Sequence, residues 1–69
     1  MITIFSDYGI EIENRDGVYF IIYDGGGIVS EDYEIEISIE DVTKAQLGPE
    51  QARQVLLKNE ARRSKVTRG

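Results

Sequence analysis

The chain contains neither cysteine nor histidine, and only one of its 69 residues is proline. Without cysteine there is no disulfide, and without either residue type the thiolate and imidazole ligands of common metal sites are missing. The same absence removes the usual nucleophile–base pairs of covalent catalysis. We therefore expect a protein that is not an enzyme, has no small-molecule substrate and holds no cofactor or metal ion.

Long apolar runs are missing too. No stretch approaches the roughly 20 apolar residues of a membrane-spanning helix, and Asp7 interrupts the apolar start that a signal peptide would need. We expect a cytoplasmic protein without a membrane partner. A chain this short buries only about 60% of its surface on folding, so either one modest core suffices or a second copy completes it.

Basic residues are scarce in the first two thirds of the chain. Residues 1–47 carry eleven acidic side chains against Arg15 and Lys44, a balance of −9, whereas residues 48–69 have a balance of +4. Together they give the net charge of −5. A phosphate backbone is held by Lys and Arg, so this acidic body disfavours nucleic acid as a ligand and favours a partner protein with a basic surface.

Four segments show the β-branched and aromatic content, or the alternation, that is typical of strands. They cover residues 1–5, 9–14, 18–23 and 33–39. An Asp-Gly pair at 16–17 signals a hairpin, and a glycine-rich connection runs over 24–32, with a short extended piece expected at 28–29. Short loops between successive strands predict an antiparallel meander.

Helical signals begin after the fourth strand. Ser38 followed by Asp41 resembles a capping pair, which predicts a short helical turn over residues 40–46. Proline suits the first position of a helix, and one clear helix is predicted from Pro49 to about Arg63. Its apolar face carries Ala52, Val55, Leu56 and Asn59.

These elements predict an α+β fold in the order β-β-β-β-α. A four-stranded antiparallel meander would carry one C-terminal helix on one face. We expect residues 1–63 to form a single compact domain and residues 64–69 to be a frayed basic tail.

The face of the sheet away from the helix is the candidate site. Alternation assigns Ile10, Ile12, Ile35, Ile37 and Ile39 to the helix side, and Glu11, Glu13, Glu34, Glu36 and Ser38 to the far side. In the third strand, burial of Phe20 is favoured, which predicts that Tyr19, Ile21 and Tyr23 line the far face. A one-residue change of register would expose Val18, Phe20 and Ile22 instead.

Aromatic side chains inside a polar rim are typical of protein-binding patches. We expect a patch that binds the basic surface of a partner protein through Tyr19, Ile21, Tyr23, Glu11, Glu13, Glu34 and Glu36. The plain alternative is that the tyrosines serve β propensity and the glutamates only solvate the face. Small acidic domains of this kind are typical of phage and mobile-element accessory proteins, namely nucleic-acid mimics, enzyme inhibitors and immunity proteins.

Two functions of other classes stay open. The basic helix end and tail are compatible with nucleic-acid binding through Arg62, Arg63, Lys65 and Arg68. A structural homodimer is the other, joined through the tyrosine face or through Leu57, which lies opposite the apolar face of the predicted helix.

Two further motifs are better explained without a ligand. Gly25-Gly26-Gly27 resembles a phosphate cradle, but no Gly-Lys-Ser/Thr follows it and the next charged residues are acidic. A flexible turn is therefore predicted. The carboxylates Glu31, Asp32, Glu34, Glu36, Glu40 and Asp41 lack the spacing of a calcium-binding loop, which predicts a solvated acidic surface.

Overall fold

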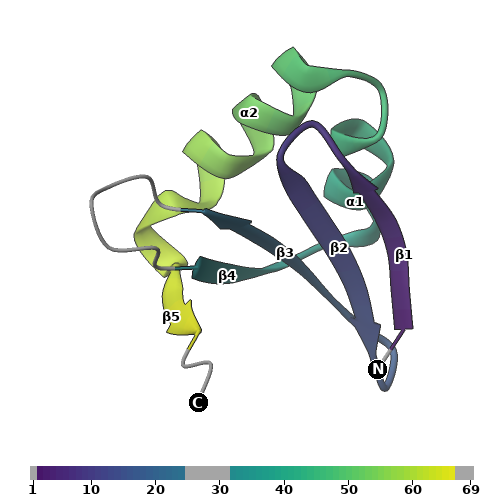
Figure 1. Cartoon of the computed structure of the whole chain (residues 1–69), viewed down its shortest axis with the longest axis vertical. Coiled ribbons are helices and arrows are strands. Elements are labelled where there is room, and N and C mark those ends of the chain that lie inside the picture. Colours follow the sequence, from purple (N-terminus) through teal and green to yellow (C-terminus); the bar gives the residue numbers. More distant parts are fainter. Residues whose placement is uncertain (1, 25–31, 67–69) are drawn as a thin grey trace.

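The structure is a computed structural model that describes residues 2–24 and 32–66 (Figure 1). The elements are β1 (Ile2–Asp7), β2 (Ile10–Arg15), β3 (Val18–Asp24), β4 (Asp32–Ile37), α1 (Ile39–Ala45), α2 (Pro49–Asn59), the 3₁₀ turn η1 (Glu60–Arg62) and β5 (Ser64–Val66). All strand pairs are antiparallel, and the strands follow one another in the sheet in chain order. The predicted α+β class and the antiparallel meander are confirmed.

The predicted numbers of strands and helices are wrong. The sheet has five strands and the described chain has two α-helices. The fifth strand, Ser64–Val66, occupies part of the expected frayed tail and pairs with β4. The guanidinium of Arg63, 4.8 Å from the ring centre of Tyr33, helps to hold this strand at the sheet edge. Residues 67–69 of the expected tail, and the extended piece expected at 28–29, lie outside the described residues.

Both hairpins of the first three strands turn through two residues. Tyr8 and Gly9 join β1 to β2, Asp16 and Gly17 join β2 to β3, and all four have positive φ angles between 53° and 87°. This is the type I′ geometry, whose twist matches that of the flanking strands. The Asp-Gly hairpin signal is therefore confirmed.

The capping prediction before α1 is confirmed. Ser38 is the N-cap, and its Oγ accepts a hydrogen bond from the backbone N–H of Asp41 at 3.2 Å. Two face assignments at this point are wrong, because the strand ends at Ile37. Ser38 belongs to the cap rather than to the far face, and Ile39 starts the helix with 55% of its surface exposed.

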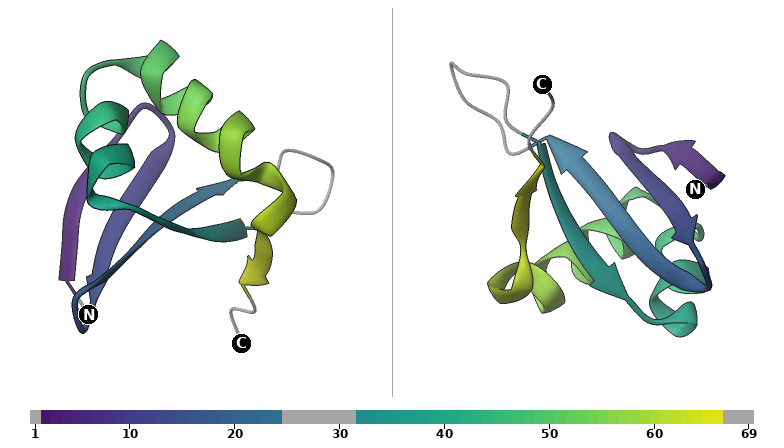
Figure 2. Two further views of the ribbon diagram at one scale, coloured as in Figure 1. Left: turned by 180° about the vertical axis from the view of Figure 1, so that it is seen from behind. Right: turned by 90° about the horizontal axis from the view of Figure 1, so that it is seen from below.

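The second helix begins at Pro49 as predicted but ends earlier, at Asn59, where η1 turns the chain back toward the sheet. Ala52, Val55 and Asn59 are buried along one side of it. Figure 2 shows that α1 and α2 both lie on the same side of the sheet. No helix in the described segments is long and apolar enough to cross a membrane.

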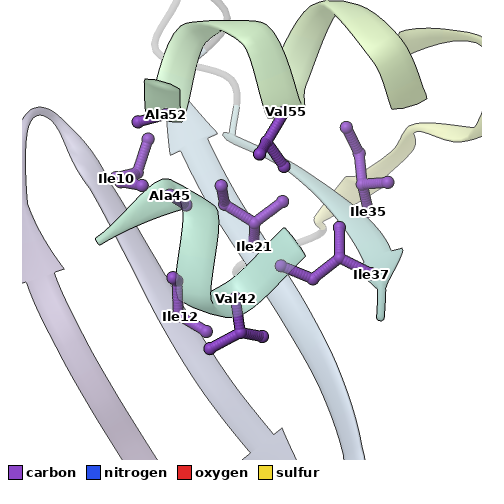
Figure 3. Packing of buried hydrophobic residues seen from close by; sticks show 9 residues of the cluster. All are labelled: Ile10, Ile12, Ile21, Ile35, Ile37, Val42, Ala45, Ala52 and Val55. Carbon is purple, nitrogen blue, oxygen red and sulfur yellow. The ribbon is translucent and has the colours of Figure 1, made fainter. Parts of the chain in front are cut away.

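The hydrophobic core lies between this side of the sheet and the two helices (Figure 3). Its buried members are Ile10, Ile12, Ile21, Ile35, Ile37, Val42, Ala45, Ala52 and Val55. Isoleucines of the three central strands form its sheet side, and small side chains of the helices allow close approach. The opposite face of the sheet has no helix of the described chain over it.

Candidate functional site

The sheet face opposite the helices is the candidate site, and we call it the open face. Residues directly opposite each other in an antiparallel ladder share a face, so the strand registers define it. Its central part comprises Glu11, Glu13 and Arg15 of β2, Val18, Phe20 and Ile22 of β3, and Glu34 and Glu36 of β4, and β1 adds Thr3 and Ser6 at one side.

The predicted orientation of the third strand is wrong. Ile21 is fully buried in the core, and Tyr19 and Tyr23 pack against that core rather than lining the open face. The cause is the two-residue turn, which pairs Arg15 with Val18 and so places Ile21 opposite a buried isoleucine of β2. Whether the two tyrosines contact a partner stays a prediction, but Ile21 offers no surface to one.

All four predicted glutamates lie on the open face. Glu11 and Glu36 are exposed, Glu34 is half-buried and Glu13 is only 7% exposed. The two exposed carboxylates therefore lie on either side of β3, on its two neighbouring strands. Their contact with a partner stays a prediction.

The buried carboxylate of this face is held by Arg15. Its guanidinium contacts Glu13 Oε1 at 3.0 Å and Glu34 Oε2 at 2.5 Å, and so bridges β2 to β4 across the sheet. The same guanidinium lies 4.4 Å from the ring centre of Phe20, on the strand between them. The hydrogen bond with Glu13 raises the pKa of Arg15 above its usual value, so this cation keeps its charge at all physiological pH values.

This arrangement explains why Phe20 is accommodated outside the core. The arginine covers one side of the aromatic ring, and the aliphatic part of such a side chain shields apolar surface while its charged end stays in contact with polar groups. Phe20 is accordingly half-buried although no helix covers it. The open face therefore has an apolar centre that is partly covered by a single cation.

The charges of the open face sum to an acidic surface. Its four glutamates outnumber Arg15, its one basic residue. A shallow hollow at the end near the β1–β2 turn adds to this acidity. Its described lining includes no basic residue and four acidic ones, Asp7, Glu11, Asp24 and Asp32.

A second hollow lies between the open face and the C-terminal strand. It is lined by Phe20, Glu34, Glu36, Arg62 and Ser64. Acidic and basic side chains both reach it, so its charge is mixed. The more uniformly acidic end of the open face is the one next to β1.

The basic residues at the helix end already have partners within the chain. Lys58 Nζ lies 3.1 Å from Asp41 Oδ1, Arg63 pairs with Glu60 at 3.0 Å, and Arg62 donates to the side-chain oxygen of Asn59. These cations are therefore less available to a phosphate backbone than the sequence indicated. Of the other two basic residues in the nucleic-acid alternative, Lys65 lies in β5 and Arg68 is outside the described residues.

The two remaining motifs of the sequence have no ligand geometry in the described part of the chain. No group of three or more carboxylates there is placed to hold a metal ion. Asp41 in particular is buried and bound to Lys58 rather than presented to solvent. The glycines at 25–27 lie outside the described residues.

Leu57 is 60% exposed on α2, on the side away from the core. It borders a small hollow together with Tyr23, Arg53, Leu56, Glu60 and Arg63. The exposure agrees with the position predicted from helical spacing. A role for Leu57 in self-association stays a prediction.

Of the open-face residues, Arg15 was not named in the predicted site, and Val18, Phe20 and Ile22 were named only for the alternative register of the third strand. A signal for Arg15 was present, because it and Lys44 are the only basic residues before Gly48. A signal for Phe20 was also present, because a two-residue Asp-Gly turn implies the register that turns Phe20 outward. In comparisons with protein-family models, curated proteins and solved structures, nothing matches this chain.

Proposed function

We propose that this chain is a small protein-interaction module whose open face binds the basic surface of a partner protein and thereby inhibits or regulates it. The single observation that carries the proposal is the composition of this face. Exposed Glu11 and Glu36 lie on either side of an apolar centre, Val18 and Phe20, that no described helix covers.

Physical complementarity supports this role. An apolar centre with a charged rim gives both a desolvated contact and a sign preference for the partner. The excess of glutamates over Arg15 favours lysine- and arginine-rich surfaces, including those that handle nucleic acid. The proposed role is binding rather than catalysis, and cytoplasmic location and relation to phage or mobile-element accessory proteins remain part of the same proposal.

Two charge-matched double variants test the proposal. The immobilised chain is exposed to a host extract at low salt, and retained proteins are identified by mass spectrometry. The open-face variant Glu11→Gln/Glu36→Gln is compared with the helix-side variant Glu40→Gln/Glu50→Gln, which has the same net charge and changes only exposed residues. We expect the open-face variant to lose a basic partner that the helix-side variant retains.

Other outcomes contradict the proposal. Equal loss in both variants would mean that only net charge attracts the retained proteins. Retention that is insensitive to salt and to both variants would exclude an electrostatic interface. Recovery of nucleic acid instead of protein would favour the basic helix end and tail.

A further inference from the structure

The two edges of the sheet are built differently. Natural sheets protect a free edge by shortening it or by placing charges, above all lysine, along it. The β5 edge has both devices, since Ser64–Val66 is three residues long and includes Lys65. The β1 edge, six residues long, has one charged residue, Asp7.

The β1 edge is also apolar and accessible. Ile2 is 66% and Ile4 is 42% exposed, and every residue of the strand except Phe5 is exposed. In the described part of the chain β1 has a neighbouring strand on one side only. A register irregularity between Thr3 and Phe5 separates the pairs of Ile2 and Thr3 from those of the half of the strand nearest the turn, Phe5 to Asp7.

The backbone of this half presents unpaired groups to solvent. The two-residue Tyr8-Gly9 turn makes its flanking pair, Asp7 and Ile10, the hydrogen-bonded one. Alternation then makes the next pair, Ser6 and Glu11, the one without mutual hydrogen bonds. The backbone N–H and C=O of Ser6 therefore point away from β2.

We propose that β1 accepts an extended segment of the partner protein as an additional strand, with basic and apolar residues alternating along that segment. This inference rests on the proposed function and names its docking mode. Strand addition to a free edge supplies main-chain hydrogen bonds, and alternate side chains supply specificity.

The alternation follows from the two faces that meet at β1. Ser6 lies opposite Glu11 and therefore belongs to the open face, so a partner residue beside Ser6 is directed toward the acidic hollow. Phe5 lies opposite buried Ile12 and packs against the core, so a partner residue beside Phe5 extends the apolar side. Lysine or arginine suits the first place and a β-branched residue the second.

Charge disfavours a second copy of this chain at the same edge. Residues 1–47 have a balance of −9, and pairing two β1 strands would bring two such bodies together. Like charges close to an interface are repulsive. A basic segment meets no such penalty.

Synthetic peptides test the inference without the natural partner. One peptide of about eight residues, a common strand length, alternates Arg and Val, and a second has the same composition in two blocks. Binding is followed by amide chemical shifts of the full chain. We expect the alternating peptide to bind more tightly, to shift the amides of β1 and β2 first, and to slow hydrogen exchange at the Ser6 amide.

A pair of variants separates the backbone from the side chain. Ser6→Pro removes the outward N–H, and a proline is tolerated where that group faces solvent at a sheet edge. Ser6→Ala removes the hydroxyl and retains the N–H. We expect Ser6→Pro to weaken binding of the alternating peptide about tenfold or more, and Ser6→Ala to change it less than about twofold. If Ser6→Pro does not fold, hydrogen exchange of the unmodified chain tests the inference instead. Strand addition requires that the alternating peptide slow exchange at the Ser6 amide.

The opposing outcomes are distinct. Peptide binding that shifts Phe20 and Glu36 without protecting Ser6 would overturn strand addition and leave the proposed function standing. No preference for either basic peptide over an alternating Glu-Val peptide would overturn both. A concentration-dependent dimer that is lost in Ser6→Pro would assign the edge to a second copy.

Discussion

The side-chain amide of Asn59, in α2, donates a hydrogen bond to the carboxylate of Asp41, in α1, over 3.2 Å. Both residues are buried, at 2% and 5% exposure. The same amide donates to the backbone oxygen of Val55 at 2.9 Å, and Lys58 Nζ lies 3.1 Å from the other oxygen of Asp41. A buried carboxylate is tolerated only with such partners, so this pair specifies how the two helices pack.

Replacing Asp41 with alanine is expected to lower the free energy of unfolding by about 2 kcal/mol, because the amide of Asn59 loses an acceptor in a buried place. The N-terminal turn of α1 also loses a favourable negative charge. Urea denaturation measures the change. Glu40→Ala, an exposed acid in the same turn, is the control and should cost no more than about 0.5 kcal/mol. Similar losses in both variants would contradict a role for the buried pair.

The orientation of β3 predicts losses of stability of different size at two of its residues. Ile21→Ala should lower the free energy of unfolding by about 2–5 kcal/mol, because it leaves a cavity in the core. Val18→Ala, at a residue 39% exposed on the open face, should cost less than about 1 kcal/mol. Thermal or urea unfolding distinguishes them. A larger loss for Val18→Ala would mean that the strand has the reverse orientation.

Removing the cation of the open face should destabilise the sheet. Arg15→Ala leaves the carboxylate of Glu13, 7% exposed, without its nearest cation, and we expect a loss of about 1–3 kcal/mol. Arg15→Lys should recover only part of this, because an ammonium lacks the fork that reaches two carboxylates and the planar group that stacks on Phe20. The midpoints of denaturation should rank the unmodified chain as most stable, Arg15→Lys as intermediate and Arg15→Ala as least stable. Arg53→Ala, an exposed arginine of α2, should be nearly neutral; an equal effect there would refute the bridge.

The second hairpin requires glycine at position 17 for its backbone conformation and not because a side chain there would clash. Gly17 has a φ of 87°, and a Cβ added there would meet no atom within 4 Å. Gly17→Ala should therefore cost about 1 kcal/mol through the left-handed conformation alone. Asp16→Asn keeps a residue that tolerates the φ of 53° at this position and should change stability by less than about 0.5 kcal/mol. Thermal unfolding measures both changes in stability. A Gly17→Ala variant as stable as the unmodified chain would exclude the type I′ turn.

The error in the predicted site has a specific physical origin. The burial preferences of single residues favoured an inward Phe20. The length of the hairpin turn, however, fixes which residues of β2 and β3 are paired, whatever those preferences are. With Asp16-Gly17 as a two-residue turn, Ile12 must face Ile21, and Phe20 must share a face with Glu13. The stacked guanidinium of Arg15 then lowers the cost of an aromatic ring outside the core.

The strands up to β4, the Asp16-Gly17 turn, the Ser38 cap and the start of α2 at Pro49 were determined by the sequence itself. These features depend on groups only a few residues apart, such as the Asp41 N–H and Ser38 Oγ. Only the tertiary structure decided the pairing of Ser64–Val66 with β4 and the bond between Asp41 and Asn59, which are 18 residues apart. Such contacts form when separate segments meet around a shared core, and their favourable energy must exceed the entropy of closing the chain between them.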